Sequence, residues 1–186
     1  IMGRHYARLS AEPEAGAKAV FDCYLPRFAG DDLAQTPAGL LVGIADRLDS
    51  LAGLFAAGLA PTGTKDPFAQ RRAALGLVQS LIGAQVPFDL REGLALAAAG
   101  LPLSASPESL AACFDFVVGR LRSYLLEEGA FRFDVIDAVL AAQSADPLGA
   151  WQACRGLSER IARPDWTTLL QAYARCVRIT RDQKEI

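Results

Sequence analysis

One group of basic side chains has the spacing of a phosphate-binding surface. In residues 61–72 (PTGTKDPFAQRR), Lys65 is followed by two adjacent arginines, Arg71 and Arg72. The two prolines and the glycine exclude a regular helix across the first half of this stretch and predict a turn-rich loop. A loop lysine beside the free N–H groups of a helix start, with two arginines one turn later, can bind a phosphate.

The same stretch also allows a purely structural interpretation. Asp66 is expected to cap the next helix and Pro67 to be its first residue. In this interpretation the loop is a rigid connection between helices, Arg71 or Arg72 pairs with carboxylates, and Phe68 fills the core.

A second basic group recurs at every third position near the end of the sequence, and its members are Arg175, Arg178, Arg181 and Lys184. Only one acidic residue, Asp182, interrupts this stretch, so its local charge is positive. On a helix this spacing gives a basic stripe that drifts around the surface and suits a phosphate backbone. The alternative is a solvated helix face without a ligand.

The elements that must position these side chains are expected to be helices throughout. Ala and Leu dominate the apolar content, and β-branched residues rarely alternate with polar ones, which indicates an all-α helical bundle. Cap residues followed by proline, at Thr36 with Pro37 and at Ser106 with Pro107, are strong start signals. Helices are predicted over residues 1–9, 13–27, 36–58, 66–82, 89–99, 106–128, 133–143, 146–163 and from 164 onward.

Composition limits the classes of function. The chain has 186 residues, 52% of them hydrophobic, which suffices for one large helical domain or two small ones. Its formal net charge is −2, so any contact with nucleic acid must come from local clusters. No apolar run approaches the roughly 20 residues of a membrane span, so no membrane association is expected. A helical pattern that is still running at the last residue, and Ile1 before Met2, predict an internal fragment of a longer protein.

The four cysteines, Cys23, Cys113, Cys154 and Cys176, are widely separated and form no CxxC pair. They are expected to be reduced thiols in a reducing compartment, which predicts a cytoplasmic protein.

Several strings of residues carry a family resemblance in addition to these patterns. The main ones are TPAG at 36–39, IADRLDSL at 44–51 and PTGTKDPFAQRRAALG at 61–76. Shorter flanking strings agree in order: IMGRHYA at 1–7, YLPRFAGD at 24–31, GRLRSYL at 119–125 and AYAR at 172–175. With these strings the chain resembles the β subunit of two-subunit bacterial glycyl-tRNA synthetase. The resemblance covers nearly the whole chain and is weakest over residues 143–168.

The resemblance implies a division of labour. In that family the α subunit binds glycine and ATP with Mg and catalyses the reaction, while the β subunit binds tRNA through several domains. Residues 1–100 would be the later part of an HD-like helical domain, and residues 101–186 would lead into an anticodon-binding domain. The implied partners are tRNA(Gly) and the α subunit or a fused α module, with β–β or α–β association. This piece would hold no cofactor, no metal and no catalytic residue, and its RNA-binding residues would be Lys65, Arg71, Arg72, Arg175, Arg178, Arg181 and Lys184.

Two alternatives remain open at this point. The helices can be a scaffold that joins domains or subunits without touching RNA. An HD-type phosphohydrolase is the other alternative, and it needs several His and Asp ligands around a metal. The sequence has one histidine, His5, and the carboxylates of Asp46 and Asp49, three residues apart, do not complete such a site.

Overall fold

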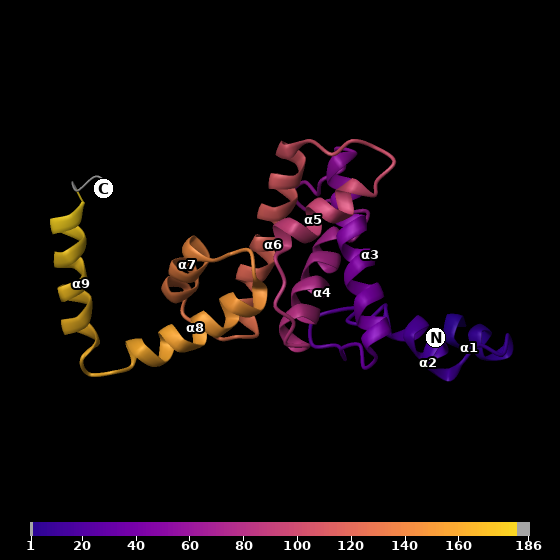
Figure 1. Cartoon of the computed structure of the whole chain (residues 1–186), viewed down its shortest axis with the longest axis horizontal. Helices are drawn as coiled ribbons and strands as arrows, with labels where there is room; N and C mark the ends of the chain where they lie inside the picture. Colours follow the sequence, from indigo (N-terminus) through magenta and orange to yellow (C-terminus); the bar gives the residue numbers. More distant parts are fainter. Residues whose placement is uncertain (1, 182–186) are drawn as a thin grey trace.

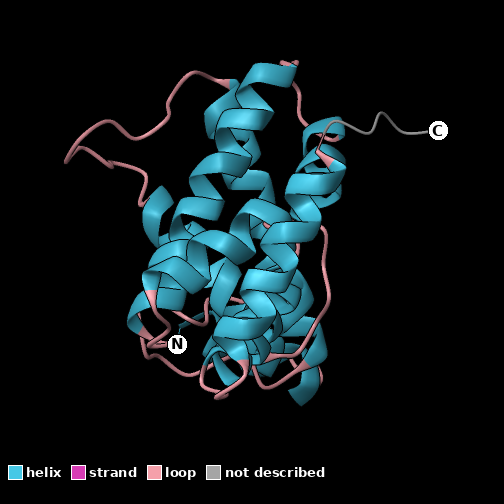
Figure 2. Cartoon of the chain, turned by 90° about the vertical axis from the view of Figure 1, so that its left-hand side faces the viewer, coloured by secondary structure: helices cyan, strands magenta, loops and turns pink. Residues whose placement is uncertain are grey.

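All regular secondary structure in the described residues, 2–181, is α-helical in the computed structural model (Figures 1 and 2). The helices are α1 Met2–Leu9, α2 Glu14–Asp22, α3 Pro37–Ala56, α4 Gln70–Gly83, α5 Leu90–Ala99, α6 Pro107–Glu127, α7 Phe133–Ala142, α8 Pro147–Ile161 and α9 Trp166–Thr180. The all-α prediction is therefore confirmed. In this part of the chain no helix combines the length and the apolar character that a membrane crossing requires.

The hydrophobic core lies between α3, α4, α5 and α6 in the centre of the molecule (Figure 1). Leu51 of α3, Leu77 and Leu81 of α4 and Leu121 of α6 are fully buried there, and each such side chain contributes roughly 2 kcal/mol. The core continues into α7, which packs on α6, and into α8, which packs on α4 and α7. Helix α6 packs on α3 and α4, so the core includes residues from both sides of position 100. The predicted division into two domains at that position stays a prediction.

Helix starts follow the predicted capping signals at several places. The Thr36 hydroxyl accepts a hydrogen bond from the Gly39 N–H at 3.2 Å, and the Ser106 hydroxyl accepts one from the Ser109 N–H at 3.1 Å. Each cap satisfies a backbone donor that the first helical turn leaves free.

Helix α2 is shorter than predicted, since it ends at Asp22 and not near Arg27. The Asp22 carboxylate is buried and accepts hydrogen bonds from the Gln35 N–H (3.1 Å), the Thr36 N–H (2.9 Å) and the Thr36 hydroxyl (2.8 Å). These bonds tie the end of α2 to the start of α3. Residues 23–36 therefore form a loop, which we call the 23–36 loop.

Helix α4 begins at Gln70, three residues later than predicted from Pro67. Ala69 has a left-handed conformation (φ 54°), which turns the backbone just before the helix. The Asp66 carboxylate still caps the helix, because it accepts hydrogen bonds from the Gln70 N–H (2.8 Å) and the Arg71 N–H (2.9 Å).

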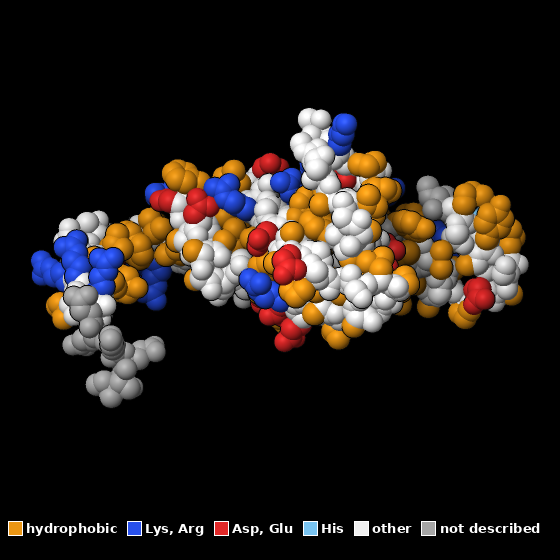
Figure 3. Space-filling model, turned by 90° about the horizontal axis from the view of Figure 1, so that it is seen from above, with side chains coloured by type: hydrophobic (Ala, Val, Ile, Leu, Met, Phe, Trp, Pro, Cys, Tyr) orange, Lys and Arg blue, Asp and Glu red, His pale blue; other side chains and the backbone are white. Residues whose placement is uncertain are grey.

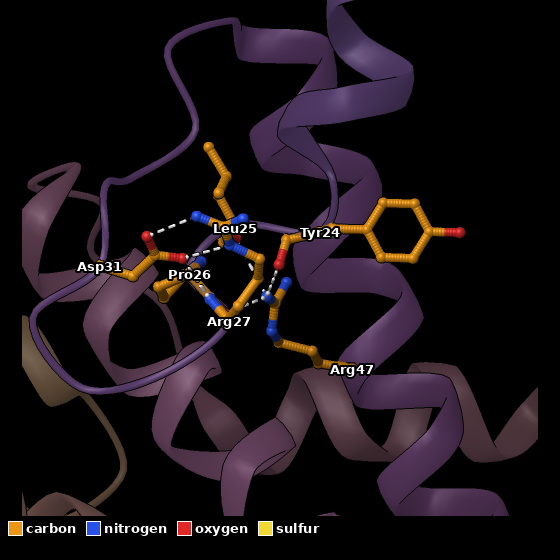
Figure 4. Close-up of polar contacts among 6 residues, drawn as sticks. All are labelled: Tyr24, Leu25, Pro26, Arg27, Asp31 and Arg47. Carbon is orange, nitrogen blue, oxygen red and sulfur yellow. Dashed lines mark hydrogen bonds and ion pairs between the residues drawn. The ribbon is translucent and has the colours of Figure 1, made fainter. Parts of the chain in front are cut away.

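The 23–36 loop is attached to the bundle by the buried side chain of Arg47 on α3 (Figure 4). The Arg47 guanidinium donates to the carbonyls of Leu25 (3.0 Å), Pro26 (3.1 Å) and Gly43 (2.7 Å), with longer contacts of 3.4 Å to two more loop carbonyls. Burial lowers the pKa of this guanidinium. No carboxylate in the described residues is hydrogen-bonded to it, so carbonyl dipoles compensate the buried charge.

Two glycines make room for the Arg47 guanidinium. A Cβ atom at Gly76 of α4 would lie 2.8 Å from Arg47 Nε and 3.3 Å from the Pro26 carbonyl oxygen. A Cβ atom at Gly43 of α3 would lie 2.8 Å from Arg47 Nη1 and from the Cys23 carbonyl oxygen. Both helices therefore lack a side chain where they approach the loop.

We predict that Gly76→Ala destabilises the chain, although alanine favours helix over glycine. The added methyl group must displace the Arg47 guanidinium from its carbonyls, at a cost of about 1–3 kcal/mol in the free energy of unfolding. The matched control is Gly156→Ala in α8, where no atom other than those of the adjacent residues and the helix's own backbone lies within 4 Å of the added carbon, and a gain of about 0.5–1 kcal/mol is expected. Urea unfolding followed by circular dichroism measures both, and equal stabilisation by the two substitutions would contradict the packing described.

Candidate nucleic-acid interface

A depression of about 550 Å³ lies where the 23–36 loop, α4 and α6 meet. Four arginines from these three segments line it: Arg27, Arg71, Arg72 and Arg120. We call it the basic depression. One acidic side chain, Glu127, also lines it, so cationic side chains dominate the wall. Arg71 and Arg72 were predicted from the sequence, whereas Arg27 and Arg120 were not.

Arg27 is held in place by Asp31 within the 23–36 loop (Figure 4). The Asp31 carboxylate accepts hydrogen bonds from the Arg27 side chain at 2.8 and 2.9 Å and from the Arg27 backbone N–H at 2.8 Å. These bonds hold the pKa of Asp31 well below its usual range. The Arg27 side chain is 49% exposed and that of Asp31 only 5%, so the pair presents its cation outward.

The adjacent arginines of α4 differ in their contacts. Arg71 donates to the Gly63 carbonyl and has Nη1 3.9 Å from the Asp66 carboxylate, so it also fastens the preceding loop. This pairing matches the structural interpretation of the stretch. Arg72 is exposed and makes no ion pair or side-chain hydrogen bond within residues 2–181, so its guanidinium is available to a ligand.

Arg120 reaches the basic depression from α6. Its side chain is half-buried, and its Nε–H is buried without a hydrogen-bond acceptor in the described part of the chain. The guanidinium carbon lies 5.9 Å from the centre of the Phe116 ring. The rest of the guanidinium also makes no ion pair or hydrogen bond in the described residues, so its accessible N–H groups at the basic depression can bind an anionic ligand.

Lys65 lies outside the basic depression, at the end of a tight turn over residues 62–65. The Lys65 N–H donates to the Thr62 carbonyl at 2.8 Å, and the Thr62 N–H donates back at 3.2 Å. Gly63 has φ +51°, a backbone conformation that suits glycine. Phe68, which the structural interpretation placed in the core, is instead 51% exposed.

The second predicted basic group lies on a separate surface. Arg175, Arg178 and Arg181 are exposed on or directly after α9, which lies at the opposite end of the molecule from α1 and α2 (Figure 1). Figure 3 shows Lys and Arg side chains gathered at this end. The fold therefore does not bring these arginines to the basic depression, and Lys184 lies outside the described residues.

Metal ligands do not gather within residues 2–181. No three His, Cys, Asp or Glu side chains there lie close enough together to bind a metal ion. His5 and Asp46 are both exposed, and no ion pair of Asp46 with an arginine forms in this part of the chain.

Comparison with known proteins places the chain in a family. Residues 1–141 match the model of the family described as glycyl-tRNA synthetase beta subunit. The chain belongs to this family. Among its glycine–tRNA ligase beta subunit relatives, the protein of Chromohalobacter salexigens is 42% identical over 99% of the chain, that of Myxococcus xanthus 40% over 98%, and that of Moorella thermoacetica 38% over the whole chain.

The chain spans only 27% of the length of each of these glycyl-tRNA synthetase β-subunit relatives. All residues of the basic depression fall inside the segment that matches the family model, whereas α9 and its arginines fall outside it.

We predict that Arg71 and Arg72, although adjacent, contribute differently to stability. Arg71→Gln removes the bond to the Gly63 carbonyl and weakens the loop, which lowers the free energy of unfolding by about 1 kcal/mol. Arg72→Gln removes no ion pair or side-chain hydrogen bond and changes the free energy of unfolding by less than about 0.5 kcal/mol. Urea unfolding of the two variants is the measurement, and a larger loss for Arg72→Gln would show that the contacts are assigned to the wrong arginine.

Proposed function

We propose that this chain binds tRNA and positions it during glycyl-tRNA synthesis. The observation that carries the proposal is the convergence of four arginines from the 23–36 loop, α4 and α6 on one depression. Arginine binds phosphate oxygens through two parallel N–H donors, so a cluster of this kind suits the backbone of a nucleic acid. Lys65, on its exposed turn, extends the cationic surface beyond the depression.

Membership of the family also supports the proposed role in tRNA binding. The relatives are glycine–tRNA ligase beta subunits, and this chain corresponds to about a quarter of such a protein. In the proposal the complete cytoplasmic enzyme uses ATP with Mg, and the α subunit or an α module carries the chemistry. This part of the β subunit contributes RNA contacts and no catalytic residue, and it works alongside the α subunit and further β-subunit domains.

Positioning follows from the physics of phosphate contacts. They fix the register and orientation of an RNA without reading its sequence. The α9 arginines lie on a surface apart from the basic depression, so one tRNA that meets both surfaces would be held at two points. Two points of attachment restrict its orientation far more than one, which helps to bring its acceptor end to a distant active site.

The competing possibility is a scaffold whose helices join domains without touching RNA. Salt separates the two, because phosphate contacts release counterions and packing between helices does not. A scaffold therefore shows no salt-dependent affinity for tRNA.

We predict that Arg72→Gln combined with Arg120→Gln weakens binding of the chain to tRNA(Gly) by about tenfold or more. The slope of the logarithm of the tRNA association constant against the logarithm of the salt concentration should become shallower by about 2, or about 1 for each lost phosphate contact. The control is Arg155→Gln with Arg160→Gln, which removes the same charge from exposed positions on α8. Fluorescence anisotropy at several salt concentrations is the measurement, and equal effects of the two double variants, or no binding by the unaltered chain, would overturn the proposal.

A further inference from the structure

The basic depression continues into a second depression of about 460 Å³. Both are lined by Arg27 and Arg72, so these two side chains lie at their common border. We call the combined surface the arginine groove. Asp46 and Glu127 also line it, one in each half, but the arginines outnumber them.

Exposed phenyl rings are concentrated in this groove. In the described residues three phenylalanines are largely exposed: Phe28 at 57%, Phe68 at 51% and Phe133 at 66%. Phe28 lines the basic depression and Phe68 lines the second one, so two of the three border the arginine groove. A phenyl ring left in water forgoes the free energy of burial, which favours a ligand that covers it.

Both rings are carried by loops that are fastened to the bundle. Phe28 follows Arg27, whose guanidinium lies 5.6 Å from the centre of the ring, and Arg47 binds the carbonyls just before them. Phe68 lies in the loop that the Asp66 carboxylate ties to the start of α4. Loops held in this way lose little conformational freedom when a ligand binds.

Aromatic rings alternating with arginines are suited to one form of RNA. In a duplex the faces of the bases are covered by their neighbours, whereas an unpaired base exposes a flat face that stacks on a phenyl ring. The phosphates on either side of such a base then meet the arginines of the groove. An acidic peptide would satisfy the arginines but offers no succession of flat faces.

We propose that the arginine groove binds an unpaired stretch of RNA, with bases stacked on Phe28 and Phe68 and phosphates held by Arg27, Arg72 and Arg120. This inference rests on the proposed function and adds that the groove selects unpaired over duplex RNA.

The test compares an oligouridine of about 12 nucleotides with a blunt RNA duplex of about 12 base pairs, each bound to the full 186-residue chain. Phe28→Leu combined with Phe68→Leu keeps apolar side chains and removes the two phenyl faces, while the exposed Tyr24 ring of the second depression stays in place. We expect about tenfold or greater loss of affinity for the oligouridine, an unchanged salt dependence and unchanged affinity for the duplex. The control, Phe133→Leu, removes a ring on α7 that is more exposed than Phe28 or Phe68 and should leave both affinities unchanged.

Several outcomes would overturn the inference. Unchanged oligouridine binding by the double variant, or equal weakening of oligouridine and duplex binding, would remove the role of stacking while leaving the proposed function intact. Displacement of the RNA by a polyglutamate peptide of equal charge, at equal concentration, would point to a protein partner. Absence of binding to either RNA by a chain that still binds tRNA(Gly) would overturn this inference alone, whereas absence of binding to tRNA(Gly) as well would remove the proposed function.

Discussion

A buried cation held by backbone carbonyls is the constraint on which the rest of the structure depends. A guanidinium inside a helical bundle is costly unless its donors are bonded, and Arg47 meets this requirement by binding the carbonyls of the 23–36 loop. The loop must therefore lie against α3 and α4, which in turn requires glycine at Gly43 and Gly76. Because Arg27 and Phe28 follow the bound carbonyls directly, the same contacts place them beside the arginines of α4 and α6.

An acidic chain thus obtains a cationic surface by convergence and not by composition. The net charge is −2, yet four arginines from distant parts of the sequence border one depression. They are not equivalent. Arg27 is fixed by a bond within its own loop and Arg71 by a bond from α4 to the preceding loop, whereas Arg72 and Arg120 have no hydrogen-bond acceptor in the described residues. The surface is therefore preorganised by its internally bonded arginines, and its unpaired arginines can still bind a ligand.

The sequence predicted the helical class and many helix starts, because capping and the 3.6-residue period are local properties. It also identified Arg71 and Arg72, which are close in sequence to a loop. It did not identify Arg27 or Arg120, since their meeting depends on packing between segments far apart in the chain. The late start of α4 was missed because a left-handed alanine at position 69 has no distinctive sequence signal. Arg47 looked like an ordinary helix residue, and only the glycines on α3 and α4 hint that a bulky group lies between them.

Thermodynamic coupling between Arg47 and Arg27 tests the role of the buried guanidinium most directly. Arg47→Lys keeps the charge but loses the forked donors that bind the loop carbonyls. If Arg47 acts by placing the loop, Arg27→Gln weakens RNA binding in the unaltered chain but has no further effect in a chain that already carries Arg47→Lys. Arg120→Gln, by contrast, weakens RNA binding equally in both backgrounds. An Arg27→Gln effect of the same size in both backgrounds would show that the loop reaches the RNA without Arg47.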